Sequence, residues 1–331
     1  MKILVVGGAG YIGSHMVKML AMQDHEVIIL DNLSTGFKEL VLYGELVVGD
    51  LSDVELMNSL FEKHDFDSVM HFAANSQVGE SITNPSKYYR NNVANTLNLL
   101  DVMVRHGVKK IIFSSTAAIF GEPDYVPIDE KHSQKPINPY GASKLMVERI
   151  LKDYAHAHHI DSVCLRYFNA CGADPEGQLG ECHEPETHLI PLVLQAASGR
   201  RKAITIYGLD YPTEDGTCIR DYIHITDLCS AHALALNYLS KECGHGLLKF
   251  NLGNGTGFSV SKVIDVIKEI ISEDNYKLNV EYGKRRHGDP AVLVADATLA
   301  KEKLGWEPRY SDLETIVRHA WAWEKKQASL G

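Results

Sequence analysis

Tyr140 and Lys144 are spaced so that a phenol could act as a base. Tyr140 directly follows Pro139, and the stretch from Tyr140 to Lys144 opens a pattern of helical periodicity. Proline suits the first turn of a helix because its missing N–H would have no partner there. Side chains four residues apart lie on one face of a helix, so an ammonium at 144 can favour the ionised phenol at 140. Lowering a phenol pKa from about 10 to about 7 takes about 4 kcal/mol, which a lysine and a second positive charge can supply together.

An isolated Tyr-x-x-x-Lys is more often an exposed tyrosine with a solvated lysine, so its meaning depends on the other elements. Glycines at 7, 10 and 13 follow a continuous apolar run at 3–6, which is typical of a buried strand, and a helical pattern follows them at once. Glycine permits a tight turn and a close approach of the backbone to phosphate, while the N-terminus of the next helix points N–H groups at it. The residues predicted to contact a dinucleotide here are Gly7, Gly10, Tyr11, Ile12 and Gly13.

An acidic residue distinguishes the two nicotinamide dinucleotides. Asp31 directly follows the next apolar strand, at 27–30, and comes 18 residues after Gly13. A carboxylate there suits the ribose hydroxyls of NAD and repels the 2′-phosphate of NADP. No arginine follows Asp31 closely. A glycine turn in another kind of α/β protein is the alternative, but strand, loop, helix, strand and acid in this order favour an NAD site.

Apolar strands and helical patterns alternate through the first half of the chain. Further strands are predicted at 46–48, 68–72, 111–113 and 162–165, and helices near 53–63, 86–106 and 140–158. This alternation predicts an α/β fold with a Rossmann-like, doubly wound parallel sheet. Ligands bind beyond the carboxyl ends of such strands, and the sequence puts Asp50, Ala73, Thr116 and Asn169 there.

The pattern changes after residue 169. Residues 172–188 are rich in Gly, Pro, Glu and His and predict a long loop, which in a compact domain is more often functional than idle. Shorter elements follow at 189–197, 204–207, 260–271, 278–282 and 313–323. We therefore predict an NAD-binding domain over 1–168, to which a segment near 217–240 can return, and a smaller α/β substrate-binding domain over 169–331.

Composition excludes several classes of partner. The net charge of −10 over 331 residues argues against a nucleic-acid or anionic-membrane surface. Six scattered cysteines without a CxxC pair fit a reducing cytoplasm. The sequence contains neither a leader pattern nor a run of about 20 apolar residues. His183 and His188 flank acidic residues without a recognised zinc spacing, so no metal is predicted.

Motifs over nearly the whole chain carry a family resemblance. With the loop at 7–13, Ser115-Thr116 after a middle strand and Tyr140-x-x-x-Lys144, the sequence resembles the extended short-chain dehydrogenase/reductase family, and within it the 4-epimerases of UDP-glucose. The run at 211–224 is the most specific. The motifs of the closer match are Asp31-Asn32-Leu33, Val78-Gly79-Glu80-Ser81, Asn91-Asn92-Val93, Arg166-Tyr167-Phe168-Asn169, Tyr211-Pro212-Thr213-Glu214-Asp215-Gly216-Thr217, Arg220-Asp221-Tyr222-Ile223-His224 and Arg285-Arg286-His287-Gly288-Asp289.

The resemblance implies an isomerase of galactose metabolism that interconverts UDP-glucose and UDP-galactose through a 4-keto sugar, with tightly bound NAD. It implies that Tyr140 is the base at the 4-hydroxyl, Lys144 binds the nicotinamide ribose and Thr116 hydrogen-bonds O4. The other implied cofactor contacts are Asn32, Leu33, Ser34, Thr35, Gly36, Asp50, Leu51, Phe72, Ala73, Ala74, Asn91 and Phe168. The other implied substrate contacts are Asn169, His188, Leu189, Tyr207, Arg220, Arg286, Asp289 and Leu293, with the two arginines at the diphosphate and Asp289 at the uridine ribose.

The resemblance also implies a homodimer through helices near 86–106 and 140–158, and two departures from it bear on function. Ser76 stands where many relatives carry a lysine, which puts one phosphate contact in doubt. Leu293 stands where a tyrosine often crowds the sugar pocket, which leaves room for a 2-acetamido group. We therefore expect some activity on UDP-N-acetylglucosamine besides UDP-glucose.

Three alternatives remain open. A dehydratase or decarboxylase on the same scaffold is the nearest, but a dehydratase of this family would be expected to carry Asp-Glu after Thr116, where this chain has Ala117-Ala118. The second is an NAD-dependent dehydrogenase that releases NADH. The third is a catalytically silent NAD sensor, which would have no chemical reason to keep Thr116, Tyr140 and Lys144 together.

Overall fold

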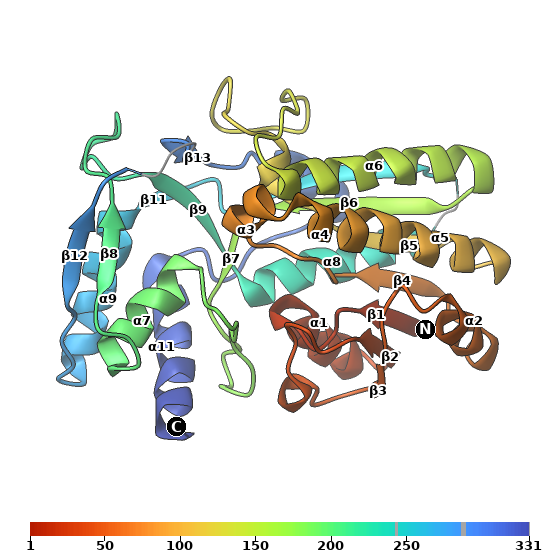
Figure 1. Cartoon of the computed structure of the whole chain (residues 1–331), viewed down its shortest axis with the longest axis horizontal. Helices are drawn as coiled ribbons and strands as arrows, with labels where there is room; N and C mark the ends of the chain where they lie inside the picture. Colours follow the sequence, from red (N-terminus) through yellow and green to blue (C-terminus); the bar gives the residue numbers. More distant parts are fainter. Residues whose placement is uncertain (242–243, 286–288, 331) are drawn as a thin grey trace.

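A large parallel sheet with helices on both faces forms one side of the molecule (Figure 1). The computed structural model describes residues 1–241, 244–285 and 289–330. The sheet has seven strands in the order β10-β6-β5-β4-β1-β2-β3, and every neighbouring pair is parallel. Its strands are β1 (Lys2–Val6), β2 (Glu26–Asp31), β3 (Glu45–Val48), β4 (Ser68–His71), β5 (Lys110–Ser114), β6 (Asp161–Tyr167) and β10 (Leu247–Leu252).

Alternating side chains of these strands form two apolar cores, one on each face of the sheet. Ile3 and Val5 of β1 lie in one core, and Leu4 and Val6 lie in the other. The first core is covered by α1 (Tyr11–Met22), α8 (Ile225–Lys241) and α10 (Thr298–Leu304). The second is covered by α2 (Val54–Lys63), α5 (Asn95–Arg105) and α6 (Pro139–His158). The predicted doubly wound α/β fold is confirmed.

The strand order reverses at β1, because β2 and β3 extend the sheet to one side and β4 lies on the other. In open α/β sheets, ligands bind beyond the carboxyl ends of the strands at such a reversal. The loop after β1 therefore starts at the position that the topology favours for a ligand.

The single helix predicted near 86–106 is wrong in detail. The structure has α3 (Val78–Thr83), α4 (Pro85–Tyr88), a π-helical segment at Tyr89–Ala94 and then α5. A π-helical segment turns the following side chains relative to a regular helix and occurs often at functional sites. Here the π-helical segment directs the Asn92 side chain into the interior, and Asn92 is 3% exposed.

The chain returns to the large sheet late in the sequence. Helix α8 packs against α1, and β10 then pairs with β6 as the edge strand. Strand β9 (Ile219–His224), which precedes α8, belongs to a different sheet. The division into domains at residue 168 stays a prediction.

The remaining elements form a smaller group beside the large sheet (Figure 1). Strand β9 pairs with β7 (Asn169–Cys171), β11 (Gly257–Ser259) and β13 (Val292–Leu293), and β8 (Ile204–Tyr207) pairs with β12 (Val280–Gly283). Helices α7 (Leu189–Ser198), α9 (Val260–Glu273) and α11 (Leu313–Leu330) build a third apolar core against them. Short 3-10 turns lie at Lys38–Leu40 (η1) and Ala117–Ile119 (η3). Within the described ranges, every helix is too short or too polar to cross a membrane.

Candidate active site

The glycine loop after β1 is shaped to admit a phosphate. Gly7 has a φ of +84°, and a Cβ there would lie 2.5 Å from the backbone nitrogen of Ala73. A Cβ on Gly13 would lie 2.1 Å from the Gly7 carbonyl oxygen, so only glycine lets α1 pack this closely on the turn. A Cβ on Gly10 would meet a single atom, at 3.5 Å. Gly7 and Gly13 therefore serve packing, while Gly10 leaves space for a ligand to approach the backbone.

Helix α1 presents its positive end to that space. Its N-cap is Gly10, which makes no side-chain capping bond, and its first turn carries no acidic residue. The unpaired N–H groups and partial positive charge of such an end favour a phosphate. The donors present thus fit the diphosphate of a dinucleotide. The Tyr11 hydroxyl points elsewhere and donates to the Gly172 carbonyl at 2.7 Å.

Asp31 is fixed at the end of β2 beside this loop. One carboxylate oxygen accepts from the Ala9 N–H at 2.9 Å and the other from the Leu33 N–H at 2.8 Å. Gly36 belongs to the same surface, since a Cβ there would lie 2.8 Å from the Ala9 backbone. The structure therefore brings the predicted acid next to the glycine loop, with lone pairs left for ribose hydroxyls.

The other residues predicted at the cofactor follow β2, β3 and β4, which lie on the two sides of β1. The Asp50 carboxylate accepts from the Asn32 side chain and from the Ser52 N–H at 2.8 Å, which ties the end of β3 to the end of β2. The N–H groups of Phe72 and Ala73 both donate to the Val6 carbonyl, at 2.8 and 3.1 Å. The predicted residues Ser34, Thr35, Leu51 and Ala74 follow the same strands in the chain, and Leu51 is buried in the second apolar core.

Tyr140 and Thr116 meet at the carboxyl end of β5. Tyr140 lies in the first turn of α6, whose N-cap Asn138 accepts from the Gly141 N–H at 2.8 Å. A Cβ on Gly141 would lie 2.4 Å from the Ala118 carbonyl, so this glycine lets α6 approach the turn that begins at Thr116. Burial raises the pKa of Tyr140, and its hydrogen bond with the Thr116 side chain lowers it in part.

Lys144 is buried and bonded to the backbone. Its Nζ donates to the Ser114 carbonyl at 2.8 Å and lies 4.7 Å from the centre of the Phe113 ring. Burial lowers the pKa of Lys144 to about 7. The net shift of the Tyr140 pKa is upward, whereas Lys144 together with a second positive charge was predicted to lower it.

The structure contains a buried ion cluster behind the site that the sequence did not predict. Glu148, one turn beyond Lys144 on α6, accepts from Ser115 Oγ at 2.7 Å and from Arg166 Nε and Nη2 at 2.9 and 2.6 Å. Lys249 Nζ lies 3.0 Å from the same carboxylate. Burial alone would raise the pKa of Glu148, but the bonds from Arg166 and the nearby Lys249 hold it below its usual value. Because Ser115 directly precedes the Thr116 turn, the cluster fixes that turn against α6.

Asn92 is a second residue that the predictions missed, because the sequence does not distinguish it from the neighbouring Asn91. Its side chain donates to Ser143 Oγ and to the Asn75 carbonyl, both at 3.0 Å, and accepts from the Asn75 N–H at 2.9 Å. Asn91, which was predicted at the cofactor, donates to the Asn92 side chain at 3.1 Å. Asn92 thus ties the loop after β4 to the helix that carries Tyr140.

A cavity of about 280 Å³ lies on the other side of the site, between β7, α7, β8 and β9. The predicted substrate residues that line it are Asn169, His188, Leu189, Tyr207, Arg220 and Asp289. Arg201 lines it too, and nothing in the local sequence singled out that cation. Arg286 lies outside the described residues.

Arg220 and Asp289, which were predicted to contact different parts of a substrate, form an ion pair with each other. Asp289 also accepts from the Tyr211 hydroxyl at 3.3 Å, and the Arg285 guanidinium lies 4.0 Å above the Tyr211 ring. A nucleotide ligand would therefore meet a charged pair that is already oriented.

Leu293 connects the cavity to the Thr116 turn. It pairs with Arg220 in the β13–β9 register. Together with Phe168 it packs on a small apolar core that contains Ala117 and Phe120. The Leu293 side chain therefore lies beside the turn that begins at Thr116.

Known proteins are similar to this chain in sequence and in fold over nearly its whole length. The model of the NAD dependent epimerase/dehydratase family matches residues 3–253. The chain is 51% identical over 326 residues to a UDP-glucose 4-epimerase of Halalkalibacterium halodurans, covering 98% of this chain and 96% of that one. The crystal structure of UDP-glucose 4-epimerase from Brucella ovis in complex with NAD superposes with a TM-score of 0.93 at 49% identity, over 97% of each chain. The UDP-Glc/GlcNAc 4-epimerase of Campylobacter jejuni superposes with a TM-score of 0.84 at 44% identity, over 98% of this chain and 99% of that one. The chain belongs to the NAD dependent epimerase/dehydratase family.

Proposed function

We propose that this chain interconverts UDP-glucose and UDP-galactose by inverting C4 of the sugar, with NAD held in the site. The observation that carries the proposal is the position of Thr116 and Tyr140, between the glycine loop and Asp31 on one side and the cavity with Arg220 on the other. The names of the relatives support the same activity.

The residues divide the work by position. When bound, NAD⁺ supplies a hydride acceptor and donor and the second positive charge that the phenol requires. Tyr140 takes the proton from the sugar's O4 and later returns it, while the Thr116 hydroxyl bonds O4. Lys144 bonds the nicotinamide ribose and favours the phenolate. Arg220 holds the diphosphate, a group that a guanidinium fork matches well, so the keto sugar can turn and present its other face.

A dehydratase on the same scaffold needs groups that the Thr116 turn lacks. Elimination of water would require an acid and a base after Thr116, and the turn carries Ala117 and Ala118 there. A dehydrogenase would release reduced cofactor. Epimerisation needs no acid and base after Thr116 and releases no reduced cofactor, since the sugar and the cofactor both end in their starting oxidation states.

Incubation with UDP-galactose and no added cofactor tests the proposal. We expect UDP-glucose to form, NAD to be found in the denatured protein, and no lasting rise in NADH absorbance. Sustained growth of the NADH signal, or a dehydrated product, would contradict it.

Leu293 gives a prediction about substrate range, which the name of the Campylobacter relative supports. We expect the enzyme to turn over UDP-N-acetylglucosamine. Leu293→Tyr should lower kcat/KM for that sugar by about 10-fold or more, because one or two lost contacts or a clash of this size is worth about 1–3 kcal/mol. Activity on UDP-glucose should change little, which serves as the internal control. Undetectable turnover of the acetamido sugar by the unmodified enzyme would refute the prediction.

We further propose a homodimer through α5 and α6, which lie next to each other along one side of the large sheet (Figure 1). Leu97 on α5 is half-buried and Met146 on α6 is 46% exposed, whereas Leu100 is fully in the core. Light scattering should give twice the chain mass of 36.8 kDa. Leu97→Arg should give monomer, and Met22→Arg, at an exposed position on α1, should not. Unmodified protein that stays monomeric at micromolar concentration would exclude this interface.

We place the chain in the cytoplasm, without a nucleic-acid or membrane partner. The free thiols of Cys164, Cys171, Cys182 and Cys229 support a reducing compartment, and the net charge of −10 supports the lack of a polyanionic partner.

A further inference from the structure

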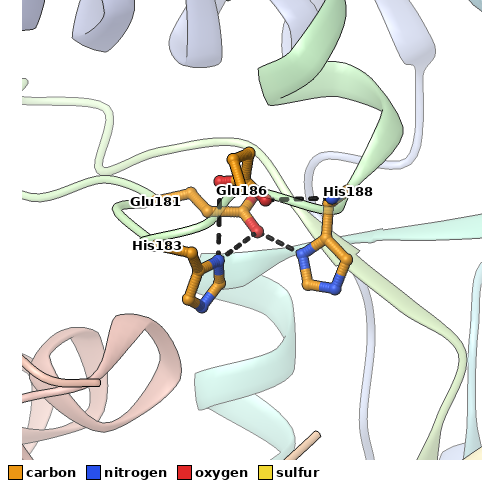
Figure 2. A group of neighbouring side chains, drawn as sticks. All are labelled: Glu181, His183, Glu186 and His188. Carbon is orange, nitrogen blue, oxygen red and sulfur yellow. Dashed lines mark hydrogen bonds and ion pairs between the residues drawn. The ribbon is translucent and has the colours of Figure 1, made fainter. Parts of the chain in front are cut away.

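Two glutamates and two histidines of the loop before α7 converge on one point. Figure 2 shows Glu181, His183, Glu186 and His188 with their polar atoms directed at one another. One ligand atom from each residue lies within 4.8 Å of the other three. The His183 Nδ1 is 3.2 Å from Glu181 Oε1 and 3.5 Å from Glu186 Oε2, and His188 Nδ1 contacts Glu181 Oε1.

We propose that these four side chains form a binding site for one zinc-class divalent cation. Tetrahedral zinc binds nitrogen and oxygen ligands at about 2.0–2.2 Å, which separates neighbouring ligand atoms by about 3.3 Å. The distances from His183 Nδ1 to Glu181 Oε1 and to Glu186 Oε2 bracket that value, whereas His188 Nδ1 and Glu181 Oε1 lie closer together and would separate on binding the cation. Magnesium and calcium prefer oxygen ligands, whereas a set of two imidazoles and two carboxylates suits zinc and its first-row neighbours.

Burial of the carboxylates supports a bound cation. The side chains of Glu181 and Glu186 are 4% and 3% exposed. Among the residues that the structure describes, the ion pairs of both carboxylates are with the two histidines. Buried charge requires compensation, which here comes either from two imidazolium protons or from one divalent cation. In the first case, bonds to Glu181 and Glu186 would overcome the effect of burial and raise the pKa of His183 to about 10.

The backbone around the cluster orients the ligands. The N–H groups of Thr187 and His188 donate to Glu186 Oε1 at 2.7 and 2.9 Å, which leaves Oε2 facing His183. Trp323 Nε1 donates to the Glu181 carbonyl at 3.0 Å. Such outer contacts fix the direction of a ligand and add to metal affinity.

The position of the cluster assigns it a structural role. His188 is the N-cap of α7 and lines the substrate cavity, while His183 lies against the Tyr11 ring at the start of α1, with ring centres 6.1 Å apart. A second, smaller pocket is lined by Glu181 and His183. With four protein ligands and no open position, the cation would hold the loop against the cofactor side without taking part in the reaction.

The test uses full-length protein without a histidine tag, loaded with zinc and desalted. Mass spectrometry of the metal should give about one zinc per chain, and Co²⁺ loading should give the intense visible bands of tetrahedral coordination. His183→Asn should weaken zinc binding by roughly 100-fold or more, since even outer partners of a ligand are worth about 10- to 100-fold. His156→Asn, at an exposed position on α6, should bind like the unmodified chain.

If the histidine variant does not fold, zinc binding is measured on Glu186→Gln instead, because this substitution keeps the side-chain volume. Zinc well below one per chain after loading, equal affinity in the ligand variants, or an octahedral Co²⁺ spectrum would overturn the proposal and leave the cluster as a protonated ion pair. These readouts are independent of epimerase activity.

Discussion

Tyr140→Phe is expected to lower turnover of UDP-galactose by about 100- to 10,000-fold, the usual contribution of a positioned acid–base group. The variant should still bind NAD, because the ring keeps its place in the first turn of α6 and only the hydroxyl is lost. Turnover is measured by separating the two UDP-sugars, and bound NAD is measured after denaturation.

Tyr154→Phe is the matched control, since Tyr154 lies on the same helix and bonds Asp101 outside the site. It should retain nearly full activity. A Tyr140→Phe enzyme with more than about a tenth of normal turnover would show that the phenol is not the base. A silent NAD sensor would show no measurable change in either variant.

Glu148→Ala should destabilise the fold by about 3–5 kcal/mol, the typical result of removing one partner from a buried ion pair. The Glu148 and Arg166 side chains are both 0% exposed, so the variant leaves the guanidinium buried without its carboxylate. Chemical denaturation at one fixed protein concentration measures the change. Arg149→Ala, which removes an exposed ion pair with Asp153 on the same helix, should cost at most about 0.5 kcal/mol.

The same carboxylate gives a pH dependence with a definite sign. The folded pKa of Glu148 lies below its ordinary value of 4.5. Its contribution to stability is therefore complete above that ordinary value and is lost as the pH falls through the folded pKa. The difference in unfolding free energy between the unmodified chain and Glu148→Ala should shrink in acid. A difference below about 1 kcal/mol at neutral pH would mean that the cluster does not hold the Thr116 turn.

The sequence predicted the large sheet well because each strand is a short apolar run followed by a polar or glycine-rich turn. The run at 3–6 lies in β1 (Lys2–Val6), and Asp31 ends β2 beside the glycine loop as expected. Strand β10 was not predicted, since its pairing with β6 depends on the position of α8 rather than on any local pattern.

The parts of the site that escaped prediction depend on contacts between distant residues. Glu148 meets Arg166 and Lys249 only after β6 and β10 have joined the sheet. Asn92 points inward because of a π-helical segment that periodicity does not reveal. The spacing of His183 and His188 matched no familiar zinc motif, and the cluster became evident only when the loop brought both beside Glu181.

The central claim is that the hydrogen on C4 leaves the sugar and returns to it without meeting solvent, while Tyr140 handles only the O4 proton. UDP-galactose labelled with deuterium at C4 tests this most directly. The account predicts that UDP-glucose formed in ordinary water keeps the label at C4, and that unlabelled substrate converted in heavy water gains none there. Loss of the label, or entry of solvent deuterium at C4, would contradict it.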